Sequence, residues 1–259
     1  MTEATGLEAP PRTPRLGRDL AMRLAADEYE RFIAQLRELS PGDWAQPTAC
    51  PGWDVHALSC HVLGMAEFAA SVPEQMRQTH AARAAGGLFI DALTALQVDK
   101  HIGRSPADIV ERLTQVCPRA AAGRRRIPAL ARRKPLHNQP IDNTGEQTES
   151  WTLGYLTDVI LTRDTWMHRS DVAIATGQAM TLTPAHDGVL VADVAVEWAS
   201  RHDTPCALTL TGPAGAHWTF NGATGDQPGE HIELDAVEFC RVLSGRGTGS
   251  GPLAVRVPF

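Results

Sequence analysis

Helical spacing of apolar residues dominates the first 180 positions of this 259-residue chain and most constrains its fold. From Asp19 onward, apolar residues recur every three or four positions until Ser40-Pro41-Gly42 ends the pattern. Similar patterns predict helices over residues 55–78, 105–122 and 151–176, the last ended by Gly177. A long loop over residues 127–150 precedes the fourth of these helices, and residues 86–103 are helical only in places. Four long helices with one long crossing loop predict a helical bundle.

The pattern changes after Gly177. Residues 184–201 are predicted to form one more helix, followed by short strands near 206–213, 217–220 and 231–234, a helix over 235–245 and a last strand over 253–259. The expected fold is therefore mainly α, with a small α+β unit after the bundle. The domain boundaries that follow are a flexible N-terminal tail over 1–18, the bundle over 19–180 and the α+β unit over 181–259.

Charge and composition exclude several classes of protein. The chain has 24 Lys and Arg against 30 Asp and Glu, a net charge of −6, which argues against general affinity for nucleic acid or anionic lipid. No apolar run approaches the ~18 residues of a membrane span, and the N-terminus lacks the apolar core of a secretory signal. The five cysteines are odd in number and form no CxxC pair, so buried, reduced thiols are expected. These features predict a cytoplasmic protein.

The clearest chemical motif is the pair Asp164 and His168 in TRDTWMHRSD. Four residues apart on a helix, the two side chains lie about 40° apart around the axis and about 6 Å along it, so both can bind one ion. His61, in the helix predicted over 55–78, is the candidate third ligand. Taken singly, a core histidine and a surface hydrogen bond are the ordinary interpretations. Because facing helices of a bundle build metal sites, the three together indicate a divalent metal centre.

Two histidines and one carboxylate leave a coordination position open, as in catalytic rather than structural zinc sites. The net charge at such a metal is near +1, which favours an anionic fourth ligand. Hydroxide and the thiolate of a small molecule both satisfy this, since a metal holds a thiol of pKa ~8.5 deprotonated at neutral pH. The residues alone therefore leave nucleophilic thiol chemistry and hydrolysis open.

Other polar residues carry weaker signals. Asp171 follows His168 by three positions and either orients that histidine or serves the helix surface. Arg241 and Arg246 lie in the α+β unit, where one of them can pair with a carboxylate of a substrate or thiol, and Arg241 is the candidate. The basic run from Arg124 to Lys134 has no interleaved aromatic residues and is interpreted as a solvated helix end and loop, with recruitment of an anionic substrate as the alternative.

Several segments together closely resemble the mycothiol-dependent maleylpyruvate isomerase family, over residues 19–259. They are CPGWDVHALSCHVLG, TLGYLTDVILTRDTWMHRSDVAIATG, LTLTGPAGAHWTF and IELDAVEFCRVLSGR. The resemblance implies a DinB-like four-helix bundle followed by a small α+β domain. It also implies that His61, Asp164 and His168 are the metal ligands and that mycothiol is the cosubstrate.

The function implied by this resemblance is that of a metal-dependent enzyme, with zinc as the expected metal. A metal-bound thiolate of mycothiol would attack a small electrophilic substrate, as a mycothiol-dependent isomerase or as an S-transferase. The expected partners are a low-molecular-weight thiol and a small-molecule substrate, without nucleic acid or membrane. Two alternatives remain open: a hydrolase that uses metal-bound hydroxide, and a non-catalytic protein that binds a metal or a small ligand.

Overall fold

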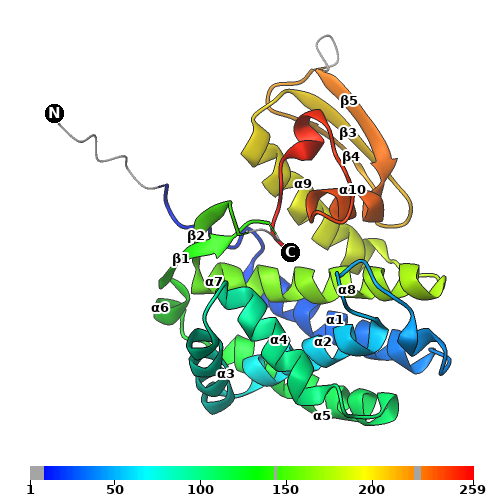
Figure 1. Cartoon of the computed structure of the whole chain (residues 1–259). Helices are drawn as coiled ribbons and strands as arrows, with labels where there is room; N and C mark the ends of the chain where they lie inside the picture. The colour runs from blue at the N-terminus through cyan, green and yellow to red at the C-terminus, as the bar shows by residue number, and fades with distance from the viewer. Residues whose placement is uncertain (1–8, 143–144, 225–228) are drawn as a thin grey trace.

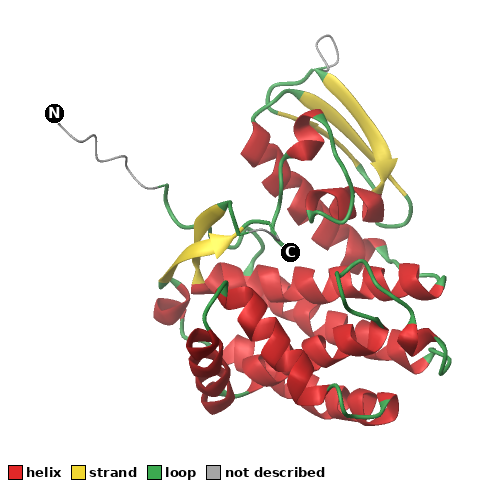
Figure 2. Cartoon of the chain, in the orientation of Figure 1, coloured by secondary structure: helices red, strands yellow, loops and turns green. Residues whose placement is uncertain are grey.

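The structure, a computed structural model, describes residues 9–142, 145–224 and 229–259 and has two parts (Figure 1). A bundle of long helices forms the larger part, and a smaller unit of helices and one sheet packs beside it. In the described residues, strands occur in a hairpin at the edge of the bundle and in the sheet of the smaller unit (Figure 2). The predicted fold class, mainly α with a small α+β unit after a four-helix bundle, is confirmed.

Four long helices make up the bundle, and capping residues explain where they begin and end. These are α1 (Arg18–Arg37), α2 (Val55–Ala70), α5 (Pro106–Arg126) and α8 (Leu161–Thr176). The side chains of Asp54 and Ser105 accept hydrogen bonds from first-turn amides of α2 and α5, as N-cap residues do. Gly177 ends α8 in the left-handed conformation. The four helices pack on one another around a shared apolar core.

A pair of shorter helices follows α2 and packs against it. The helix predicted over residues 55–78 is wrong in its second half, because Ser71 has an extended backbone that separates α2 from α3 (Val72–Ala85). Ser71 caps α3 and Pro73 occupies its first turn, so the proline starts a helix rather than kinking one. The stretch over residues 86–103, predicted to be helical only in places, contains α4 (Phe89–His101), which contacts both α2 and α3. The bundle thus carries an added helical hairpin on its α2 face.

The long loop predicted before the fourth helix is partly ordered. It contains α6 (Ala129–Arg132) and an antiparallel hairpin of β1 (Pro135–Pro140) and β2 (Thr148–Thr152). Arg12, in the predicted tail, pairs its backbone with the hairpin and its side chain with Glu149 at 2.7 Å. Residues 1–8 of that tail lie outside the described residues. The fourth helix begins as α7 (Leu153–Tyr155) and passes through a π-helical segment, η2 (Leu156–Ile160), before α8.

The smaller unit covers its sheet with helices. It comprises η3 (Pro184–Gly188), α9 (Val189–His202), β3 (Cys206–Thr211), β4 (His217–Phe220), β5 (Glu230–Asp235) and α10 (Ala236–Leu243). Strand order is β4-β3-β5, with β3 antiparallel to β4 and parallel to β5. The strand predicted over residues 253–259 is wrong. That segment begins inside a 3-10 turn, η4 (Gly251–Ala254), and Pro258 has no amide hydrogen with which to join a sheet.

Buried ion pairs and a common apolar core join the two parts. Leu24 of α1 and Trp166 of α8 belong to the same core as the helices and strands of the smaller unit. Arg169 of α8 donates to Glu28 at 2.9 Å and also to Asp187 of η3, and all three side chains are buried. The smaller unit is therefore anchored on α8, the helix that carries two of the predicted metal ligands.

The prediction of a solvated basic run is wrong at Arg124. Its side chain is buried and donates to the Thr157 carbonyl at 2.6 Å and to the Thr162 hydroxyl at 2.5 Å. The guanidinium thus supplies hydrogen bonds at η2, where the backbone departs from α-helical hydrogen bonding. The sequence alone does not predict this π-helical segment.

Among helices built from the described residues, none combines the length and the apolar character that a membrane span requires.

Candidate metal centre

His61, Asp164 and His168 converge between α2 and α8. The Nε2 atom of His61 lies 3.7 Å from Asp164 Oδ2, and the Nε2 atom of His168 lies 3.3 Å from Asp164 Oδ1. One donor atom from each of the three residues lies within 4.8 Å of the others. Both imidazoles are buried, whereas the Asp164 side chain is 25% exposed, so the group opens to solvent on the carboxylate side. The structure therefore brings together the three residues that the sequence singled out.

The charges of this group are coupled. Burial raises the pKa of Asp164, but the two histidines outweigh that effect and hold the pKa below its usual range. Burial likewise lowers the pKa of His168, but Asp164 outweighs it and the pKa lies well above the usual value. The raised pKa of His168 favours its protonated imidazole, whose positive charge balances the carboxylate when no cation is bound. A divalent cation balances the same charge and accepts the same lone pairs, so this donor set fits a metal such as zinc.

The outer ring nitrogen of each histidine has its own buried partner. His61 Nδ1 lies 2.8 Å from Gln97 Oε1, and His168 Nδ1 lies 3.2 Å from Asp171 Oδ2. Metal-binding histidines commonly donate their second ring N–H to a carboxylate or carbonyl oxygen in this way. The partners leave both Nε2 atoms facing Asp164.

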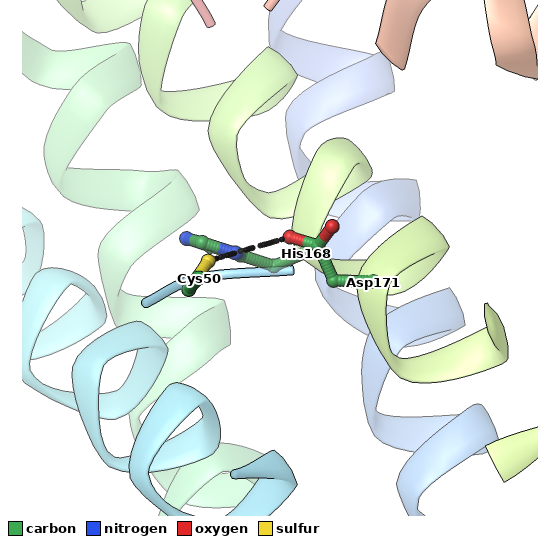
Figure 3. Close-up of side chains that lie close together, drawn as sticks. All are labelled: Cys50, His168 and Asp171. Atoms are coloured by element: carbon green, nitrogen blue, oxygen red, sulfur yellow. Dashed lines mark hydrogen bonds and ion pairs between the residues drawn. The ribbon is translucent and has the colours of Figure 1, made fainter. Parts of the chain in front are cut away.

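Asp171 in turn is held by the smaller unit. Arg246 donates from Nε to Asp171 Oδ1 at 2.7 Å and from Nη2 to Oδ2 at 2.7 Å, a two-pronged ion pair. Burial raises the pKa of Asp171, but His168 and Arg246 outweigh it and hold the pKa at about 2. Figure 3 shows Asp171 and Cys50 beside the His168 ring, and the Cys50 sulfur lies 3.6 Å from Asp171 Oδ2. The structure thus places Asp171 where it can orient His168.

A tight turn brings Cys50 and Trp53 to the group. The Trp53 amide donates to the Cys50 carbonyl at 3.0 Å across Pro51 and Gly52, and Gly52 has φ +78°. Proline followed by a residue of positive φ is the pattern of a type II turn, which favours glycine at the third position. The Trp53 ring lies 5.2 Å from that of His61 and 6.5 Å from that of His168, measured between centroids. Its indole therefore forms an apolar wall beside both imidazoles.

Two other groups in the described residues have metal-ligand residue types. They are Cys50 with His168 and Asp171, and Glu28 with His186 and Asp187. Each already contains a guanidinium that neutralises its carboxylates, Arg246 in the first and Arg169 in the second. Within the part of the chain that the structure describes, the ion pairs of Asp164 are those with His61 and His168. Charge balance therefore favours the Asp164 group as the cation site.

Some neighbours of this group were predictable from the sequence and others were not. Arg241, the candidate for pairing with a substrate carboxylate, lies 3.6 Å from Asp171 Oδ1, whereas Arg246 makes the direct ion pair with Asp171. Gln97 and Trp53 were not predicted as neighbours. Cys50 is half-buried and in contact with Asp171, unlike the other four cysteines, which are buried as expected. No spacing rule connects these residues, because they come from separate elements.

Comparisons with known proteins agree with this picture. The family profile described as "Mycothiol maleylpyruvate isomerase N-terminal domain" matches residues 25–173, a span that includes His61, Asp164 and His168. A search of curated proteins finds no match.

Two solved structures share the fold: the mycothiol-dependent maleylpyruvate isomerase and a histidine-to-alanine mutant of it. Each has a TM-score of 0.54 and 15% identity, with 90% of this chain and 91% of the other covered. The family profile matches more than half of the sequence, and the likeness of fold extends over both parts of the structure. The chain therefore belongs to the family of the mycothiol maleylpyruvate isomerase N-terminal domain.

Proposed function

We propose that this chain is a metal-dependent enzyme that uses mycothiol to act on a small electrophilic substrate, by isomerisation or by thiol transfer. The convergence of His61, Asp164 and His168 carries this proposal. Family membership supports mycothiol as the thiol, because the solved relative is a mycothiol-dependent isomerase. A divalent metal such as zinc, when bound, would lower the pKa of a coordinated thiol and keep it as thiolate at neutral pH.

The residues of the chain have separate tasks in this proposal. His61 and His168 supply neutral nitrogen donors, and Asp164 supplies the one negative charge. The open side of Asp164 gives a thiol access from solvent, because that side chain is the exposed member of the group. Trp53 excludes water from the face formed by the two imidazoles. The site in this proposal is thus largely buried, and Asp164 is its exposed member.

Thiol-dependent turnover of the zinc-loaded protein tests the proposal, with maleylpyruvate as the first substrate and other unsaturated carbonyl compounds as alternatives. We expect turnover that requires both zinc and mycothiol. Zinc-dependent hydrolysis that ignores the thiol would instead indicate a hydrolase using bound hydroxide. Zinc binding without turnover of any electrophile would indicate a binding protein.

Asp171 is proposed to orient His168 through the Nδ1 contact. Replacing it by asparagine, Asp171→Asn, preserves the size of the side chain but removes the charge that pairs with Arg246 and polarises the imidazole. Losing such a partner typically costs about 10–100-fold in metal affinity. Competition with a chelator measures this loss, and the exposed Asp99→Asn variant is the control. Equal zinc affinity in the two variants would remove Asp171 from the site.

Arg241 is proposed to bind a carboxylate of the substrate. Its Nη1 atom is buried and has no hydrogen-bond partner among the described residues, and it lies near the site at 3.6 Å from Asp171 Oδ1. A hydrogen bond to a charged group is worth about 1.5–3 kcal/mol, so Arg241→Met should raise the KM for maleylpyruvate about 10–100-fold. The kcat should change less. The exposed Arg23→Met is the control, and an unchanged KM would contradict the assignment.

A further inference from the structure

Two buried glutamines form a row behind His61. Gln97 of α4 accepts from His61 Nδ1 through Oε1 at 2.8 Å, and its Nε2 donates to Gln78 Oε1 at 2.9 Å. Gln78 of α3 in turn donates from Nε2 to the Gly64 carbonyl of α2 at 3.1 Å. Both glutamine side chains are fully buried. The row therefore runs from a backbone carbonyl to the outer nitrogen of a candidate metal ligand.

The direction of every hydrogen bond in this row follows from its starting point. A backbone carbonyl only accepts, so the Gln78 amide must turn its NH2 group toward Gly64. The same NH2 group lies 2.9 Å from Glu74 Oε1, a carboxylate whose pKa is held below its usual range chiefly by Arg77. Two acceptors thus fix the Gln78 amide, and its Oε1 is left to face the next glutamine.

The orientation of the Gln78 amide in turn fixes the orientation of the Gln97 amide and the position of the hydrogen on the His61 ring. Because Gln78 presents an oxygen, the Gln97 amide must present its NH2 group, which also lies 3.0 Å from the Met65 sulfur, a weak acceptor. The Oε1 atom of Gln97 therefore faces His61 Nδ1, which must carry a hydrogen. A neutral imidazole with hydrogen on Nδ1 has its lone pair on Nε2, the atom that faces Asp164.

We propose that Gln78 and Gln97 are positioning residues that fix the tautomer of His61, so that its Nε2 lone pair points into the metal centre. The metal part of this inference rests on the proposed function, whereas the tautomer does not. In this proposal the α3–α4 hairpin, which lies outside the four-helix bundle, contributes to the site, because each of its helices supplies one glutamine.

Close packing at Gly64 supports a positioning role for the contact between Gln97 Oε1 and His61 Nδ1. A Cβ atom added at Gly64 would lie 2.5 Å from Gln97 Cβ and 2.6 Å from Gln97 Cγ. Only glycine allows α4 to approach α2 this closely, and the approach brings Gln97 within hydrogen-bond reach of His61, one helical turn away. A row that served only to satisfy buried amides would not require its last oxygen to meet an imidazole.

Substitutions at Gln78 test the inference, because this residue does not touch His61. In Gln78→Lys the ammonium only donates and can still pair with Glu74. The Gln97 amide should then rotate, present NH2 to His61 and move the ring hydrogen to Nε2. In Gln78→Met neither orientation is imposed. We expect zinc affinity to fall by about 10–100-fold in Gln78→Lys, the usual effect of a disturbed ligand partner, and by less in Gln78→Met.

Ring nitrogen-15 shifts of His61 in the metal-free protein, at a pH where its imidazole is neutral, report the tautomer directly. A His61→Ala spectrum identifies the signals among the ten histidines. The inference predicts hydrogen on Nδ1 in the unmodified chain and on Nε2 in Gln78→Lys. Hydrogen on Nε2 in the unmodified chain would overturn it, even if the lysine variant does not fold. An unchanged tautomer and zinc affinity in folded Gln78→Lys would also overturn it.

The two readouts separate this inference from the proposed function. If His61 shows the expected tautomer but the protein binds no zinc, then the proposed function fails and the glutamine row still sets the tautomer. If zinc binds and thiol-dependent turnover occurs while the tautomer is reversed, the proposed function stands and the glutamines are structural.

Discussion

His168→Ala is expected to lower zinc affinity by about 100-fold or more, because disturbing only the partner of a ligand already costs about 10–100-fold. His168 supplies one of the two ring nitrogens beside Asp164, and it links the site to Asp171 and Arg246. Thiol-dependent turnover should fall in parallel with bound metal. The fold should persist, since the bundle core consists of apolar residues on α1, α2, α5 and α8.

The matched control for this variant is His56→Ala. His56 lies on α2 like His61, but its Nε2 contacts the Arg104 carbonyl at 3.0 Å and not the metal centre. Metal analysis after gel filtration, with circular dichroism to check folding, compares the variants. Full zinc occupancy in both His168→Ala and His61→Ala would contradict the ligand assignment.

Arg169→Met should destabilise the protein by about 3–5 kcal/mol, the usual cost of removing one partner from a buried ion pair. Arg169 lies next to His168 in sequence but serves the junction between the two parts. It donates to Glu28, to Asp187 and, at 3.0 Å, to the Thr181 carbonyl. Without it, the carboxyl groups of Glu28 and Asp187 remain buried with fewer hydrogen-bond and cationic partners.

Urea unfolding followed by circular dichroism measures this loss. Arg77→Met is the comparison, because Arg77 pairs with Glu74 on an exposed surface where such pairs contribute about 0–1 kcal/mol. Equal destabilisation of the two variants would show that the Arg169 network does not stabilise the junction.

The sequence contains the candidate ligands because their geometry is local. Asp164, His168 and Asp171 lie at spacings of four and three on one helix, so α-helical periodicity alone places them on one face. Only His61 required a second helix to be placed opposite, and the bundle prediction supplied it. The same locality explains why the helix end at Gly177 was predictable from a single residue.

The remaining neighbours depend on contacts between distant elements. Gln97 reaches His61 only because α4 crosses α2 at Gly64, and the stretch over residues 86–103 that contains Gln97 was predicted to be helical only in places. Arg246 meets Asp171 only because the smaller unit packs on α8. The π-helical segments likewise have no periodic signal of their own. These features are set by tertiary packing rather than by local preference.

The central claim is that His61, Asp164 and His168 hold a divalent metal with a position open to a thiol. X-ray absorption of the zinc-loaded protein, recorded before and after addition of mycothiol, tests it most directly. Before addition, the account predicts only nitrogen and oxygen neighbours at about 2.0–2.2 Å, and after addition one sulfur at about 2.3 Å. A sulfur present before mycothiol would place Cys50 or another cysteine in the ligand set. The absence of a new sulfur afterwards would mean that the metal centre does not bind the thiol, and either result would contradict the account.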